Sequence, residues 1–151
     1  MPFKINISDK SGKTYKLELE SEGLVGKELN NKVAGKEVLP ALDGYELEIT
    51  GASDKAGFPS MKEVEGVGLS AMLLTYGKSM KKRPKHEGKR KRTKNRPKGL
   101  RLRKTVRGKV ISTDINQINL KVIKQGTTPL KDIFTDQNKE TPNKEKPAEP
   151  K

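Results

Sequence analysis

Cysteine and tryptophan are absent from this 151-residue sequence, and histidine occurs once, at His86. The lack of cysteine excludes a disulfide framework, a Cys-ligated zinc or iron–sulfur site and a thiol nucleophile. A single histidine excludes any site that needs two or more. Only 30% of the residues are apolar, and no apolar run approaches the roughly 18 residues that a membrane span needs. We therefore expect a soluble, intracellular protein with no membrane contact, no cofactor and no metal.

Negative charge is nearly missing from one stretch of the chain. The sequence has 33 Lys and Arg against 19 Asp and Glu, and residues 78–109 hold 17 of these cations with one acid, Glu87. A solvated charged face or a targeting tract usually holds about five to eight such charges. Dense cations instead suit the phosphates of RNA or DNA, because binding releases condensed counterions. The stretch contains no aromatic residue, which favours phosphate contact along a folded RNA over base stacking.

Apolar residues are distributed in the opposite way. Between residues 78 and 104 only Met80, Leu100 and Leu102 are apolar, too few to offset the entropy of ordering that stretch. The last thirteen residues contain three prolines and no apolar residue larger than alanine, which predicts disorder. The sequence thus predicts three parts: a β-rich body from residues 1–77 and 105–138, a basic RNA-binding segment at 78–104, and a disordered tail at 139–151.

Most of the secondary-structure signal has a period of two. Apolar and polar residues alternate at 3–7, 15–19, 45–49 and 118–122, which is typical of strands with one buried face. Shorter strands are expected at 72–76 and from about residue 105 to 111. Helical patterning is thin. We therefore predict a mainly β fold, with a small barrel-like body that carries the basic extended segment.

Residues 49–61 form the most unusual stretch of the chain. Gly51 and Gly57 permit positive φ angles, Asp54 can accept hydrogen bonds from neighbouring backbone, and Pro59 fixes the exit. These features predict an ordered loop between strands, which can serve as a functional loop, as a structural turn at the mouth of the barrel, or as both. The letters from residue 51 to 61, GASDKAGFPSM, are similar to the signature of the ribosomal protein S6e family of archaea and eukaryotes, in which Asp54, Gly57 and Pro59 match.

Further stretches support this resemblance, namely GYELEITG at 44–51, RPKHEGKRKR at 83–92 and RKTVRGKVISTDINQINLKVIKQG at 103–126. The resemblance implies a component of the small ribosomal subunit, in which a mainly β body docks on ribosomal RNA among neighbouring ribosomal proteins in the cytoplasm. Eukaryotic members continue into a C-terminal helix with a regulated serine cluster. No serine follows Ser112 here, so the chain resembles the archaeal members.

The residues expected to contact phosphate are Lys81, Lys82, Arg83, Lys89, Arg90, Lys91, Arg92, Arg101, Arg103, Lys104 and Arg107. The same charge pattern would also suit a free-standing nucleic-acid chaperone or compaction protein. A nuclease would need a carboxylate cluster for metal, and Asp54, Glu63 and Glu65 are the candidates. We expect a structural RNA-binding protein with no catalytic residues and no small-molecule substrate.

Overall fold

The computed structural model describes residues 2–19, 22–77, 79–81, 98–135 and 137. Several predicted features lie outside these residues. They are the tail at 139–151, His86, and six of the expected phosphate-binding cations, namely Lys82, Arg83, Lys89, Arg90, Lys91 and Arg92.

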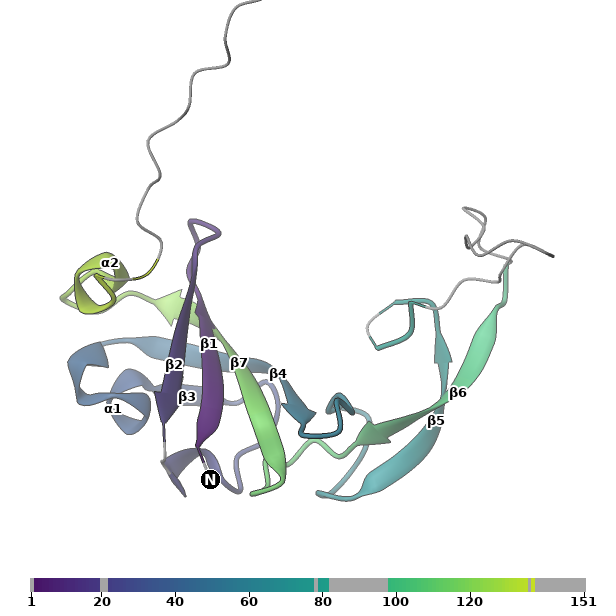
Figure 1. The fold of residues 1–151 in the computed structure, drawn as a ribbon. Coiled ribbons are helices and arrows are strands. Elements are labelled where there is room, and N and C mark those ends of the chain that lie inside the picture. Colours follow the sequence, from purple (N-terminus) through teal and green to yellow (C-terminus); the bar gives the residue numbers. More distant parts are fainter. Residues whose placement is uncertain (1, 20–21, 78, 82–97, 136, 138–151) are drawn as a thin grey trace, which may run out of the picture.

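The larger of the two sheets has five strands, β1 (Phe3–Ser8), β2 (Thr14–Leu19), β3 (Lys32–Ala34), β4 (Glu46–Asp54) and β7 (Ile115–Lys124). Their order across the sheet is β2-β1-β7-β4-β3 (Figure 1). β1 and β7 run parallel, and the other neighbouring strands are antiparallel. The strands expected at 3–7, 15–19, 45–49 and 118–122 are all confirmed within one or a few residues, because each has the alternation that a half-buried sheet requires.

One face of this sheet is covered by short helical elements. These are η1 (Glu22–Leu24), α1 (Gly35–Val38), η2 (Pro40–Leu42) and α2 (Leu130–Ile133). Leu24, Val38, Leu42 and Leu130 are buried in one cluster with the inward-facing residues of the strands. The other face carries the alternate polar residues, for example Asn119 of β7. Alternation along each strand therefore sorts the side chains into one core and one polar face.

The prediction of a mainly β fold is confirmed, but the prediction of a barrel-like body is wrong. Closure of a sheet into a barrel requires hydrogen bonds between its two outermost strands. Here β2 and β3 are those edge strands, and neither sheet of the described residues closes. The short helices bury the inner face of the sheet instead, so the body is a sheet with a covering layer.

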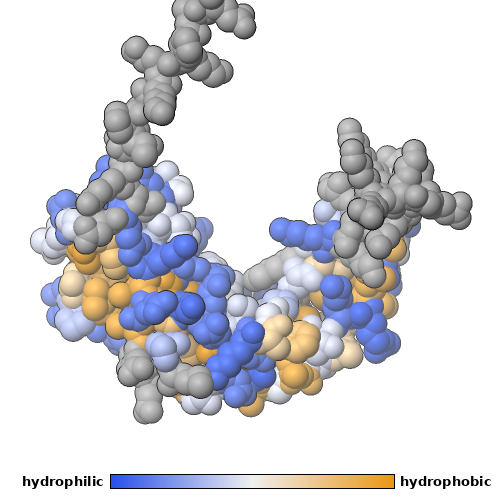
Figure 2. All heavy atoms as spheres, viewed as in Figure 1, coloured by the Kyte–Doolittle hydropathy of each residue, from blue (hydrophilic) through white to orange (hydrophobic). Residues whose placement is uncertain are grey.

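The second sheet consists of β5 (Leu69–Thr75) and β6 (Arg101–Arg107), which pair antiparallel. We call residues 56–77, 79–81 and 98–107 the arm. In the ribbon view the arm stands beside the five-stranded sheet (Figure 1), and the space-filling view shows the surface hollowed between the two parts (Figure 2). β6 begins at Arg101 rather than near residue 105, so the arm combines a strand from the predicted body with residues from the predicted basic segment.

The arm has a small core of its own. Met61, Leu74, Met80 and Val106 are buried together. Leu100 and Leu102 pack against them, and Met80 is 0% exposed. The few apolar residues of 78–104 predict that this segment cannot be ordered. For the described residues of that segment this is wrong, because residues from β5 and from 61–64 complete the cluster.

Candidate nucleic-acid interface

Arg107 holds the arm to the five-stranded sheet at their junction. Its guanidinium donates to Asp54 Oδ2 (2.7 Å), Asp114 Oδ2 (3.1 Å) and the carbonyl oxygen of Val67 (3.1 Å). The Arg107 and Asp54 side chains are each only 10% exposed. The backbone N–H of Arg107 donates to the carbonyl of Pro59 (2.9 Å). The end of β6 is thus fixed to the end of β4 and to the turn after it.

This junction keeps Asp54 ionised. Burial raises the pKa of the carboxyl group, but the hydrogen bond from Arg107, those from the backbone of Lys55 and Ala56, and the charge of Arg107 outweigh it. The pKa of Asp54 therefore lies below its ordinary value. A low pKa suits a permanent ion-pair partner rather than a group that exchanges protons near neutral pH.

The first six residues of the expected loop at 49–61 are strand, and the rest form a turn and its exit. Gly51 and Asp54 belong to β4, which pairs with β7 through irregularities beside both residues. These bulges keep the chain in the sheet where its glycine content suggested a loop. The turn itself runs from Asp54 to Phe58, whose carbonyl accepts a hydrogen bond from the Asp54 N–H (3.0 Å). Gly57 has φ +84° in this turn, and Pro59 follows it beside Ser53.

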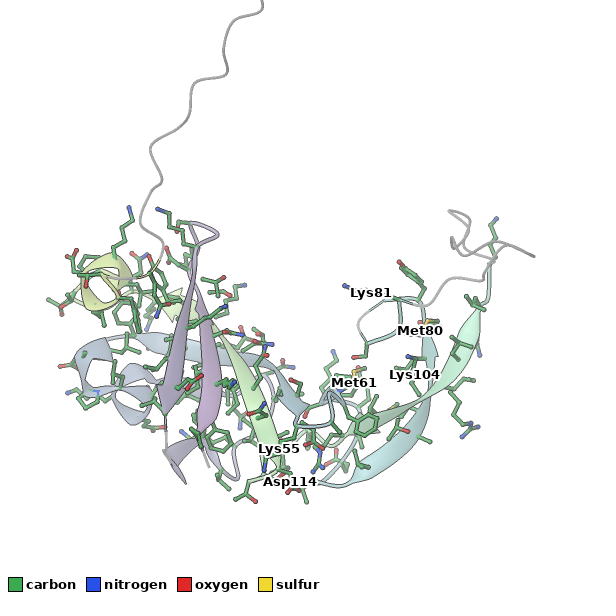
Figure 3. The ribbon with its side chains drawn as sticks, viewed as in Figure 1. Lys55, Met61, Met80, Lys81, Lys104 and Asp114 are labelled. Atoms are coloured by element: carbon green, nitrogen blue, oxygen red, sulfur yellow. The ribbon has the colours of Figure 1, made fainter. Side chains whose placement is uncertain are left out.

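Four of the predicted phosphate-binding cations lie in the described part of the arm. Arg101 and Arg103 are exposed on β6, Lys104 is half-buried, and Lys81 is exposed after the turn that ends at Met80. Lys81 and Lys104 both lie on the side of the arm that faces the five-stranded sheet (Figure 3). Arg107 does not belong with them. Its prediction as a phosphate contact is corrected, because its guanidinium is buried and paired with carboxylates.

The same four cations form no ion pair with any acid in the described residues. Lys109 shows the contrast, because its Nζ lies 3.2 Å from Glu28 and 2.9 Å from Glu65. Within the described chain, Arg107 and Lys109 near the junction are thus neutralised, and the four cations farther along the arm are available to an anion. Positive charge that lacks a protein partner is the electrostatic footprint of a phosphate-binding surface.

A groove of about 570 Å³ runs along the arm beside these cations. Its lining residues come from three separate segments and are Ala56, Gly57, Phe58, Pro59, Ser79, Arg103, Lys104 and Thr105. The groove therefore brings the turn after β4 next to the basic strand β6. It places one aromatic ring, Phe58, beside two cations.

Two of the three carboxylates that a nuclease would need are engaged in ion pairs. Asp54 is paired with Arg107, Glu65 is paired with Lys109, and Glu63 is exposed. In the part of the chain that the structure describes, no three His, Cys, Asp or Glu residues are grouped so that they could hold a metal ion. The described helices also include none that is long and apolar enough to cross a membrane.

Comparison with known families decides the relationship. Residues 3–135 match the family described as ribosomal protein S6e. The chain belongs to the ribosomal protein S6e family. Three relatives each named small ribosomal subunit protein eS6 are similar to it. That of Methanococcus maripaludis is 41% identical over 131 residues, covering 86% of this chain and 94% of the relative.

The two other relatives give the same result. The protein of Archaeoglobus fulgidus is 40% identical over 138 residues, covering 89% of this chain and 96% of the relative. The protein of Methanosphaera stadtmanae is 41% identical over 147 residues, covering 93% and 98%. The resemblance to S6e found in the residues is therefore confirmed. In this S6e chain two of the stretches that carry the resemblance, 51–61 and 103–126, meet in the Asp54–Arg107 ion pair.

Sequence reasoning missed Phe58 and Ser79 as residues of the groove. Phe58 lies outside the basic stretch, and only the pairing of Arg107 with residues 59–61 brings it beside β6 in this S6e fold. Ser79 lies within the basic stretch 78–109, but a single serine in a sequence does not indicate a binding site. Its φ of +67°, which is rare for a residue other than glycine, becomes visible only in the structure.

Proposed function

We propose that this S6e chain is a structural constituent of the small ribosomal subunit in the cytoplasm, where it binds ribosomal RNA through its basic segment and supports assembly and translation. Its relatives carry the name of a small-subunit protein, and the alignments cover nearly their full length. Neighbouring ribosomal proteins are its other partners. The body and the arm position the basic segment, and phosphate contacts supply most of the affinity.

The observation that carries this proposal is the set of cations on the arm without acidic partners among the described residues. Lys81 and Lys98 stand at the two ends of residues 82–97, which carry nine further cations and one acid. Met80 and Leu100, which lie near these two ends in the chain, pack in the same small core, so the arm brings both ends of a strongly basic stretch together. The proposed phosphate contacts are Lys81, Lys82, Arg83, Lys89, Arg90, Lys91, Arg92, Arg101, Arg103 and Lys104.

The proposal is tested by sedimentation and by the salt dependence of RNA binding. We expect the full chain to co-sediment with small subunits in a sucrose gradient at one copy per subunit. The double variant Arg101→Gln with Arg103→Gln removes two exposed cations, so the slope of log K against log salt should become shallower by about 0.7–0.9 per lost contact. The matched control is Lys10→Gln with Lys131→Gln, which removes the same charge from the body.

Two results would contradict this function. One is a chain that sediments apart from small subunits. The other is a chain that spreads over all nucleic acids in proportion to their mass, which would indicate a chaperone or compaction protein. An equal change of slope in the control pair would show that net charge, rather than the arm, governs the contact.

A further inference from the structure

The groove on the arm contains the parts of a nucleobase site. Phe58 is half-buried and lines the groove together with Arg103 and Lys104. An aromatic side chain offers a surface on which any base can stack, and neighbouring cations attract the phosphates of the same nucleotide. The volume of the groove, about 570 Å³, lies within the range of small-molecule sites, roughly 300–1,000 Å³. The groove is therefore large enough for one nucleotide.

The backbone of β6 adds hydrogen-bonding groups to this groove. The N–H of Arg107 donates to Pro59 and its carbonyl accepts from Met61 (2.9 and 3.0 Å), both on the edge away from β5. Backbone groups alternate along a strand, so those of Thr105 and Arg103 point to the same edge. Residues 59–61 pair with this outer edge of β6 only at Arg107. At the groove, amide donors and carbonyl acceptors of β6 thus face no other described strand.

Ser79 closes the groove in a sparsely populated backbone conformation. Its φ is +67° within the turn in which the N–H of Gly77 donates to the carbonyl of Met80 (2.9 Å). The Ser79 hydroxyl donates to Met61 Sδ (3.3 Å), a weak acceptor that a ligand oxygen or nitrogen could replace. Strained residues gather at ligand sites, because the surrounding packing holds them in place.

We propose that this groove binds one unpaired nucleotide of RNA, with its base against Phe58 and its phosphate on Arg103 and Lys104. The backbone edge of Arg103 and Thr105 contacts the edge of the base. This inference rests on the proposed function and adds to it a structural feature of the RNA, a bulged or looped-out base. The arm recognises that feature, while the remaining cations contact phosphates of any sequence.

The test compares two RNA hairpins that differ only in a single bulged 2-aminopurine. We expect the full chain to bind the bulged hairpin about tenfold more tightly than the fully paired one, as stacking of one base on an aromatic ring allows. Phe58→Leu keeps an apolar side chain but loses the ring, so this preference should disappear while affinity for the paired hairpin stays unchanged. Phe134→Leu, the same change in the core of the five-stranded sheet, should keep the preference.

A second measurement uses the unchanged protein. The amide signal of Thr105, an uncharged residue of the groove, should shift clearly on addition of the bulged hairpin and much less with the paired hairpin. Equal binding of both hairpins by the unchanged chain, or a preference that survives Phe58→Leu, overturns the base site. Steep salt dependence with both hairpins in that case would leave the phosphate-binding function standing, so that the two proposals fail separately.

Discussion

The guanidinium of Arg107 is surrounded by three oxygen atoms, from Asp54, Asp114 and the carbonyl of Val67. Removal of one partner from a mostly buried pair leaves the other charge desolvated without compensation. We expect Arg107→Ala to lower the free energy of unfolding by roughly 3 kcal/mol. Arg103→Ala, on the same strand but exposed, should change it by less than about 0.5 kcal/mol. Urea unfolding followed by circular dichroism measures both, and similar losses would contradict the assigned role.

The same pair gives stability a dependence on pH. The pKa of Asp54 is lowered in the folded chain, relative to about 3.9 in the unfolded chain. The folded state therefore binds this proton more weakly, so its contribution is present above about pH 4 and is lost as pH falls through the folded pKa. The difference in unfolding free energy between the natural chain and Asp54→Asn should thus shrink from about pH 5 to pH 2. Urea titrations across that range test this, and a constant difference would refute it.

At the scale of the elements, the connection after β6 depends on a close backbone approach. Gly108 is buried, its N–H donates to the carbonyl of Gly68 (2.9 Å), and a Cβ on it would overlap the carbonyl oxygen of Gly66. Backbone cannot yield as a side chain can, so Gly108→Ala should cost about 2 kcal/mol or more. Gly68→Ala is the matched control, because a Cβ there meets nothing within 4 Å. Thermal unfolding distinguishes them, and equal melting temperatures would disprove the requirement.

Strands with one buried face were predictable because each carries its own signal. β1 and β7 alternate apolar and polar residues along their length, and both were found. The start of β6 was predicted near residue 105, four residues after its true start at Arg101. Its alternation is broken at Lys104, a cation on the inward side between Leu102 and Val106. Barrel closure failed as a prediction for another reason. No residue pattern states which strands lie at the edges of a sheet.

The candidate site was predictable only in its charge. The count of cations pointed to Arg101, Arg103 and Lys104 on β6, and the structure leaves them accessible. The same count could not distinguish the buried Arg107 from the exposed cations. The burial of Arg107 against Asp54 depends on contacts between distant parts of the chain. Phe58 was missed for the same reason. Its place beside β6 follows from the backbone pairing of residues 59–61 with Arg107.

At the scale of the whole molecule, charge and core are segregated. The 119 residues outside 78–109 carry 16 cations and 18 acids, so the body is nearly neutral while the inserted stretch carries +16. Apolar surface supplies the stability of the five-stranded body. The arm joins the two parts through its own core around Met80 and through Arg107. Changes to the exposed cations of this stretch, such as Lys81, Arg101 and Arg103, should therefore alter RNA binding without unfolding the body.

β7 occupies the centre of the five-stranded sheet, between β1 and β4, yet it is the last of the five strands in the chain. During synthesis the N-terminal hairpin and β4 leave the ribosome before the strand that joins them exists. Such pairing between distant residues slows folding, because the closure of a long loop precedes any gain from contacts. The basic stretch is synthesised before β7, so it is exposed to RNA while the body is still incomplete. Under the proposed function, capture of the growing chain by RNA thus precedes the folding of the domain that later anchors it.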